Sequence, residues 1–258
     1  IKKKEAHDIA RRGRQVMIPP NPRNIEASKK FYNHAIKIDK NCALAHAGLA
    51  QADIISAWHY EFDSEKREVL LNSGTKMAEY GCKLDPSLAL SYVALSVSFL
   101  IRNRHEDAWE IAKDVVKKCP NDAVAYFCFG LVATALQKYD EALVAIKKAI
   151  DLDPLHRTNY LALMQCKFAI GNYKEAIQDF ENEFGDALIE DFPAYDWSLI
   201  IAAYLELNND EKATQLWESV KSVYPEYSVD ALMNNGTLLP KEVTEDLVET
   251  LRYFNEKE

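Results

Sequence analysis

The residues of this sequence that could do chemistry are dispersed and do not form recognisable sites. Five cysteines and six histidines occur without a C-x-x-C pair, an H-E-x-x-H motif or a Cys/His cluster at zinc-ligand spacing. Each cysteine lies in a helical hydrophobic pattern, which predicts buried reduced thiols and a reducing compartment, the cytoplasm. These cysteines are Cys42, Cys82, Cys119, Cys128 and Cys166. The sequence therefore predicts no metal site.

Catalytic motifs are also missing from the sequence. No P-loop, Rossmann glycine fingerprint or G-x-S-x-G elbow occurs. Carboxylates alternate with lysines, as in 212–218, and a solvated helix face explains this pattern better than an acid/base pair. Cys119 precedes Pro120 at an expected helix end, where the helix dipole disfavours a thiolate. We therefore predict no catalytic residues and no cofactor, and we expect that the chain is not an enzyme.

Charge is distributed unevenly along the chain. The formal net charge of −9 argues against nucleic acid as the main partner, because phosphate binding needs a concentrated basic surface. Residues 1–40 carry eleven Lys/Arg and four Asp/Glu, whereas 172–258 carry six and twenty. This polarity fits head-to-tail contact between two copies, and it equally fits two differently solvated ends of one molecule.

Composition predicts an all-α chain. Only 8 glycines and 9 prolines interrupt intervals rich in Ala, Leu, Lys and Glu, and no long period-two stretch of β-branched residues is present. The longest apolar window, Leu88–Ile101, is shorter than the ~20 residues that span a bilayer, so no membrane insertion is expected. Because the sequence begins with Ile1, we expect a fragment or a processed product of a longer protein.

A repeat of 34 residues organises the middle of the chain. Pro86, Pro120 and Pro154 are 34 residues apart, and Pro225 follows after two periods and three residues. Alanines recur before these prolines, and an aromatic residue stands sixteen positions before each alanine. The matched slots are Ala108, Ala142, Ala176 and Ala213, with Tyr92, Tyr126, Tyr160 and Trp197.

These slots resemble the tetratricopeptide-repeat (TPR) family, whose pattern is W-x2-L-G-x2-Y, then A-x3-F, then P. The stretch Ala123–Pro154 is the best match, with Tyr126, Phe129, Gly130, Ala142, Ala149 and Pro154 in family slots. Met164 and Ile201 replace the preferred glycine and Lys167 the preferred tyrosine, which affects local helix spacing only. The resemblance implies a right-handed α-solenoid of about six helical hairpins.

Physical chemistry favours the same architecture. Each period reads as two amphipathic helices separated by a polar turn, such as 102–105, 137–140, 171–173 and 208–210. One such pair cannot bury its apolar face alone, so the pairs must stack. We expect a single domain, 1–258, with repeats at 6–40, 41–86, 87–120, 121–154, 155–190 and 191–225, and a C-terminal capping helix within 226–258.

The outer repeats are expected to be irregular. The second carries an enlarged loop about 12 residues longer than the period, which includes 58–63, and the first is broken by 18–22. The cap is expected to consist of the run Ser228–Asn235 and a helix over Lys241–Phe254 with a charged outer face.

The TPR resemblance also implies a partner-binding groove, lined by the first helix of each pair. Carried over residue by residue, the groove contains Gln51, Ile54, Val93, Val97, Leu100, Phe127, Leu131, Thr134, Leu161, Gln165, Phe168 and Ser198. The strip is mostly apolar and lacks the Lys, Arg and Asn of chaperone-tail clamps. It favours an amphipathic helix from a partner protein, from the chain's own terminus or from a second copy. The alternative is a tightly wound superhelix that closes the groove on itself.

A weaker resemblance lies in the first third. Arg12-Gly13-Arg14, Phe31–Asp39 and Asn41–Ala50 look like the start of TPR regions appended to bacterial nucleotide cyclases and winged-helix regulators. It implies a protein-interaction scaffold within a larger bacterial signalling protein. The alternatives are a regulatory segment of an enzyme such as a cyclase, and an oligomerisation module.

Overall fold

The computed structural model describes residues 2–230, 232 and 238–254, and in this part of the chain it is helical, without strands. The all-α prediction is confirmed. The chain forms two compact units, 1–129 and 130–258, whose boundary falls inside helix α7 (Ala123–Ala135). Assignment of the whole chain to one domain stays a prediction.

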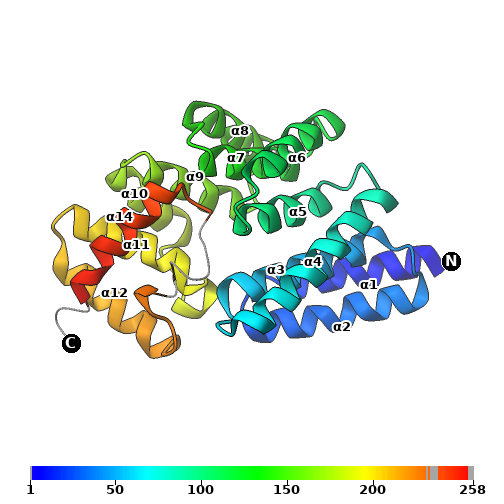
Figure 1. The fold of residues 1–258 in the computed structure, drawn as a ribbon, viewed down its shortest axis with the longest axis horizontal. Coiled ribbons are helices and arrows are strands. Elements are labelled where there is room, and N and C mark those ends of the chain that lie inside the picture. Colours follow the sequence, from blue (N-terminus) through cyan, green and yellow to red (C-terminus); the bar gives the residue numbers. More distant parts are fainter. Residues whose placement is uncertain (1, 231, 233–237, 255–258) are drawn as a thin grey trace. The chain divides into compact units, whose positions relative to one another are not determined.

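The first unit is a stack of helical pairs joined by short turns (Figure 1). Each helix packs against the next, and the first helices of successive pairs also touch one another, α1 with α3 and α3 with α5. The helices are α1 (Lys2–Val16), α2 (Pro22–Ile38), α3 (Ala43–His59), α4 (Ser64–Leu84), α5 (Ala89–Ile101) and α6 (His105–Lys118).

The second unit continues the pattern and ends differently. Here α9 touches α11 as well as its own partner α10, and a final helix, α14, packs on α11 (Figure 1). The elements after α7 are α8 (Tyr139–Leu152), α9 (Thr158–Ala169), α10 (Tyr173–Phe184), η1 (Ile189–Asp191), α11 (Ala194–Glu206), α12 (Asp210–Val223), α14 (Lys241–Leu251) and η2 (Arg252–Phe254). The expected cap is thus α14 with η2, while 231, 233–237 and 255–258 of the cap range lie outside the described residues.

The expectation of a long loop in the second repeat is wrong. Only residues 60–63 separate α3 from α4. The additional length extends the helices instead, to 17 residues in α3 and 21 in α4. Asp63 begins α4 by accepting a hydrogen bond from the Lys66 backbone N–H at 2.9 Å, which is N-cap geometry.

Four hairpins share one turn geometry. Their turns contain a residue with positive φ, namely Asn103 (56°), Gln137 (58°), Gly171 (86°) and Asn208 (57°). The next residue's N–H then bonds to the carbonyl five positions back, as from Arg104 to Phe99 at 2.8 Å. This bond ends the first helix in a Schellman motif and reverses the chain into the second helix.

Small residues set the distance between paired helices. Each alanine of the repeat slot, Ala108, Ala142, Ala176 and Ala213, is fully buried. At Gly130 a Cβ atom would lie 2.4 Å from Cγ1 of Ile146, so α7 and α8 are closer there than any side chain permits. The small residues of the repeat therefore stand where the backbones of paired helices lie closest together.

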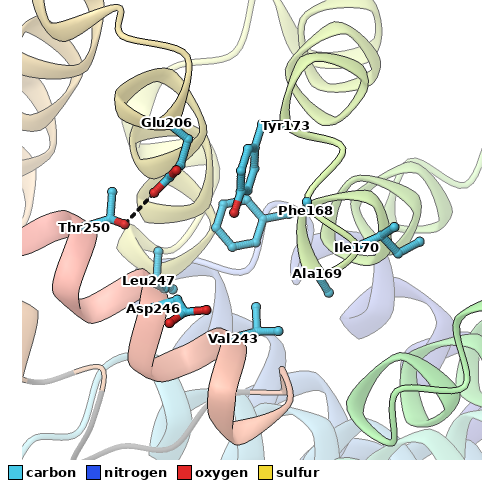
Figure 2. A pocket seen from close by; sticks show the side chains of 10 residues that line it. Phe168, Ala169, Ile170, Tyr173, Glu206, Val243, Asp246, Leu247 and Thr250 are labelled. Atoms are coloured by element: carbon cyan, nitrogen blue, oxygen red, sulfur yellow. Dashed lines mark hydrogen bonds between the residues drawn. The ribbon is translucent and has the colours of Figure 1, made fainter.

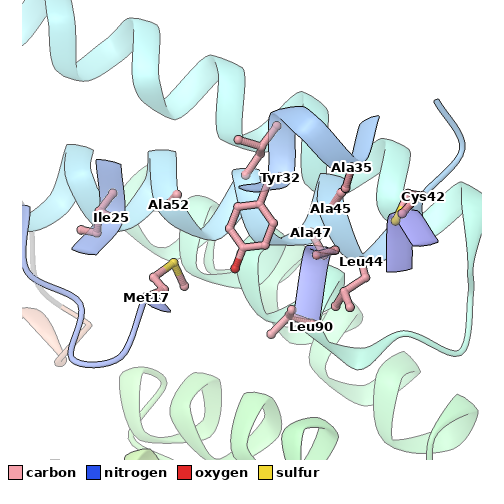
Figure 3. Close-up of a cluster of buried hydrophobic side chains, with 13 residues drawn as sticks. Met17, Ile25, Tyr32, Ala35, Cys42, Leu44, Ala45, Ala47, Ala52 and Leu90 are labelled. Carbon is pink, nitrogen blue, oxygen red and sulfur yellow. The ribbon is translucent and has the colours of Figure 1, made fainter. Parts of the chain in front are cut away.

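Tyr32 of α2 fills the core of the first unit (Figure 3). Its ring is fully buried, and it lies against Gly48 of α3, where a Cβ would approach the ring to 2.2 Å, and against Gly13 of α1. Three helices thus meet around one aromatic ring.

No helix in the described part of the chain is long and apolar enough to cross a membrane. All five cysteines are free; four are buried and Cys82 is half-buried, so the expectation of complete burial is wrong for Cys82.

Candidate functional site

The predicted groove residues lie on the first helices of the hairpins, as the repeat register requires. Gln51 and Ile54 are on α3, and the others are on α5, α7, α9 and α11. Three of the twelve are half-buried: Gln51, Phe127 and Leu161. The other nine are buried: Ile54, Val93, Val97, Leu100, Leu131, Thr134, Gln165, Phe168 and Ser198.

Ile54 fills the space inside its own hairpin. A Cβ placed on Gly74 of α4 would lie 2.6 Å from its Cγ1 atom, so the two helices close around this side chain. Its exposed fraction is 1%. Ile54 therefore stabilises the pair and offers no surface to a partner.

In the second unit, two of the predicted groove residues form hydrogen bonds with other side chains of the same chain. Gln165 donates from Nε2 to Oδ1 of Asp196 at 3.0 Å, which joins α9 to α11. The Ser198 hydroxyl lies 2.9 Å from the phenol of Tyr227, which belongs to the segment after α12. Both bonds are buried; the first joins α9 to α11, and the second joins α11 to the segment after α12.

Asp196 is the most strongly perturbed carboxyl group of this region. Burial disfavours its ionised form and raises its pKa to about 7, and the hydrogen bond from Gln165 opposes this shift. Burial also raises the pKa of Tyr227, whose phenol lies near the same carboxyl. Asp196 is thus a buried acid on α11 whose charge depends on pH near neutrality.

Helix α14 is an amphipathic helix bound by the second unit. Its buried side chains are Thr244, Leu247, Val248 and Leu251. Beyond it, Phe254 stacks on Trp217 of α12, with ring centroids 4.8 Å apart and an interplanar angle of 6°. The chain thus presents the apolar face of α14 to its own helix α11.

Contacts of α14 and η2 reach three successive hairpin turns, two of them through hydrogen bonds. Gln137 donates to Glu242 at 3.3 Å in the first turn, Thr250 donates to Glu206 at 2.7 Å in the third, and Tyr253 donates to Asp210 at 2.9 Å. Val243 and Leu247 line a pocket with Gly171 of the middle turn. Helix α14 therefore crosses the turn edge of the unit.

This pocket is a cavity of about 220 Å³ between α14 and the turn that joins α9 to α10 (Figure 2). Phe168 and Tyr173 form one wall and meet edge to face, with centroids 5.3 Å apart. Glu206 and Asp246 contribute carboxylates, and Thr250 donates its hydroxyl to Glu206. The rest of the lining is Ala169, Ile170, Gly171, Val243 and Leu247.

The sequence predicts Phe168, Gln165 and Ser198 as strip residues but does not predict the side chains that contact them. It did not single out Asp196, Tyr173 or Tyr227. A signal for Asp196 was present, since it is a lone acid in the apolar run 194–205. No local signal predicts the contacts of Tyr227 or α14, because their positions depend on tertiary packing.

Comparisons with known proteins agree with the fold. A family model described as a tetratricopeptide repeat matches residues 123–154. The chain is 27% identical over 147 residues to the TPR repeat-containing protein YpiA of Bacillus subtilis (strain 168). This match covers 56% of the chain and 33% of YpiA, so the chain spans about a third of that relative's length.

Solved structures show the same architecture. TTC0263, a thermophilic TPR protein of Thermus thermophilus, matches 80% of this chain and 98% of its own with a TM-score of 0.57 at 18% identity. PilF of Pseudomonas aeruginosa matches all of both chains with a TM-score of 0.52 at 17% identity. PilW, a type IV pilus biogenesis factor, matches 90% of this chain and 97% of its own with a TM-score of 0.54 at 13% identity. At these identities the likeness concerns the fold.

Proposed function

Since this chain is a tetratricopeptide-repeat protein, we propose that it is a protein–protein interaction scaffold that binds an amphipathic helix or peptide of a partner. The TPR fold supports the scaffold role. The proposed docking surfaces are the first-helix residues of each unit taken by itself, with half-buried Gln51 and Phe127 accessible in the first unit and half-buried Leu161 in the second. No catalytic step is assigned to the chain.

The observation that supports this proposal is the binding of α14 to α11. Leu247 and Leu251 are 2% and 0% exposed, and a fully buried leucine stabilises by about 1.5–3 kcal/mol. The repeat thus accepts an amphipathic helix, the binding mode in which apolar anchors recur every three or four residues. A partner helix with the same spacing of anchors would bind in the same way.

We expect a peptide of residues 238–254 to bind in trans once the resident helix is released. In the variant Leu247→Asp/Leu251→Asp, two buried carboxylates would detach α14 and uncover the face of α11. A fluorescein-labelled peptide should bind this variant at least about tenfold more tightly than the unmodified chain, where the tethered helix competes at a millimolar effective concentration. Fluorescence anisotropy measures both affinities.

The matched control is the same peptide carrying both aspartates, which should not bind. Circular dichroism must show that the variant chain retains its helical content. A folded variant that ignores the unmodified peptide, or binds both peptides equally, would disprove the helix-binding face.

The biological setting belongs to the same proposal. We place the scaffold in a reducing compartment, the cytoplasm, since all five of its cysteines are free. The resemblance of its first third to TPR regions of bacterial regulators supports a role within a larger signalling protein. Two alternatives remain: a regulatory segment of an enzyme such as a cyclase, and a self-assembly module. An assay of the full-length protein for cyclase activity tests the first alternative.

A further inference from the structure

The pocket beside α14 combines an aromatic wall with two carboxylates. Phe168 is 4% exposed and fixes the wall, while Tyr173 is half-buried and presents its ring to the cavity. Figure 2 shows the carboxylates of Glu206 and Asp246 coming from two different helices. An electron-rich ring face and negative charge at one cavity both attract an organic cation.

We propose that this pocket binds a cationic side chain, an arginine, presented by a partner protein, with Tyr173 against the guanidinium plane and Glu206 and Asp246 as its hydrogen-bond acceptors. A guanidinium is planar, stacks on aromatic faces and donates to carboxylates in a fixed fork. A cavity of about 220 Å³ is smaller than the roughly 300–1,000 Å³ of ligand pockets, so it suits one side chain rather than a whole small-molecule ligand.

The charges around the pocket support a cationic occupant. In the described part of the chain, the structure gives neither Glu206 nor Asp246 an ion pair with a lysine or arginine. The nearby cations are engaged elsewhere, since Lys241 pairs with Glu245 and Lys167 pairs with Glu175 and Asp179.

The pKa of the Tyr173 phenol responds to the same negative charges. Its pKa is raised first by burial and then by the charges of Glu206 and Asp246. The negative charges of both carboxylates therefore affect the tyrosine that forms part of the cavity wall. Residues 172–258 have a formal net charge of −14, which would attract a basic partner segment.

The test uses the full chain and two capped tripeptides, acetyl-Ala-Arg-Ala-amide and its citrulline counterpart. Citrulline keeps the shape of arginine and removes its charge. In ¹⁵N-labelled protein at low salt, the arginine peptide should shift the backbone amide signals of Gly171 and Thr250 with millimolar saturation. The citrulline peptide should bind at least about fivefold more weakly, because it lacks both ion pairs.

Variants locate the interaction. Glu206→Gln/Asp246→Asn should weaken arginine binding at least about fivefold, and Tyr173→Leu about threefold. The matched control is Glu249→Gln, an exposed α14 residue that is paired with Arg252 outside the pocket lining, and it should leave the affinity within about twofold. Equal binding of citrulline, or full affinity in the double carboxylate variant, would overturn the proposal.

This inference is separable from helix docking. The pocket exists only while α14 is bound, so Leu247→Asp/Leu251→Asp should lose arginine binding, and the trans peptide 238–254 should restore it. If the peptide binds but arginine never does, the cation site fails and the helix-binding face stands.

Discussion

At the scale of the residue, Asp196 shows how burial between helices changes the ionisation of a carboxyl group. The carboxyl is 6% exposed and accepts a hydrogen bond from the neutral amide of Gln165. An amide stabilises a carboxylate much less than a cation does, so burial dominates and the pKa rises to about 7. The proton therefore stays on Asp196 in the folded chain at pH values where the unfolded chain has lost it.

The sign of the pH dependence follows from this shift. A raised folded-state pKa contributes stability below the unfolded value near 4, and this contribution is lost as pH rises to about 7. The full difference corresponds to about 4 kcal/mol. We expect Asp196→Asn to match the unmodified chain near pH 4 and to exceed its unfolding free energy by about 1–4 kcal/mol at pH 8.

Urea denaturation at both pH values measures this difference, with Asp186→Asn as an exposed control in the same unit. An unchanged gap between Asp196→Asn and the parent from pH 4 to pH 8 would show that folding does not raise the pKa of Asp196.

At the scale of the element, the hairpin turns determine where the first helix of each pair ends. A side chain with positive φ is strained, by about 1–2 kcal/mol for residues other than Gly, Asn and Asp. Gln137 adopts this strained conformation, whereas Gly171 at the equivalent position adopts a positive φ without strain. At Gly171 a Cβ would have no neighbour within 4 Å, so conformation alone determines the preference there.

Reciprocal substitutions test the turn conformation. Gln137→Gly should stabilise the chain by about 0.5 kcal/mol, because the relieved strain exceeds the loss of the exposed 3.3 Å hydrogen bond to Glu242, and Gly171→Ala should destabilise it by about 1 kcal/mol. Thermal denaturation followed by circular dichroism measures both. A gain from Gly171→Ala would show that helix propensity outweighs the turn geometry.

The elements also show what could be read from the sequence. The 34-residue spacing located the hairpins from 87 to 225, because close backbone approach leaves alanine and glycine at fixed positions such as Ala142 and Gly130. The two-helix pattern did not reveal that the extra residues of 41–86 lengthen α3 and α4. Nor did it reveal that α14 turns back across earlier hairpins, since that contact joins Glu242 to Gln137, which are 105 residues apart.

The groove was predicted less completely than the fold. Register identified which residues lie on first helices, and the family resemblance assigned the inner-facing positions among them. Burial of Ile54, Leu131 and Ser198 depends on neighbours that register alone does not specify. The pocket residues Tyr173 and Asp246 come from the start of α10 and from the distant helix α14, so no repeat pattern connects them.

At the scale of the whole molecule, charge polarity bears on self-association. Residues 1–40 have a formal net charge of +7 and 172–258 one of −14. The scaffold proposal expects a monomer in light scattering coupled to size-exclusion chromatography, at both low and high salt. A dimer that weakens with salt would instead indicate contact between the basic and acidic regions of two copies, because salt screens such contacts.

The position of α14 has a consequence for biosynthesis. The hairpins that it crosses leave the ribosome first, and at about 5–20 residues per second several seconds pass before 241–251 follow. During that interval the face of α11 that α14 covers in the folded chain has no partner helix. A released chain that ended after residue 225 would thus expose the face of α11, whereas the chain that includes α14 covers this face itself.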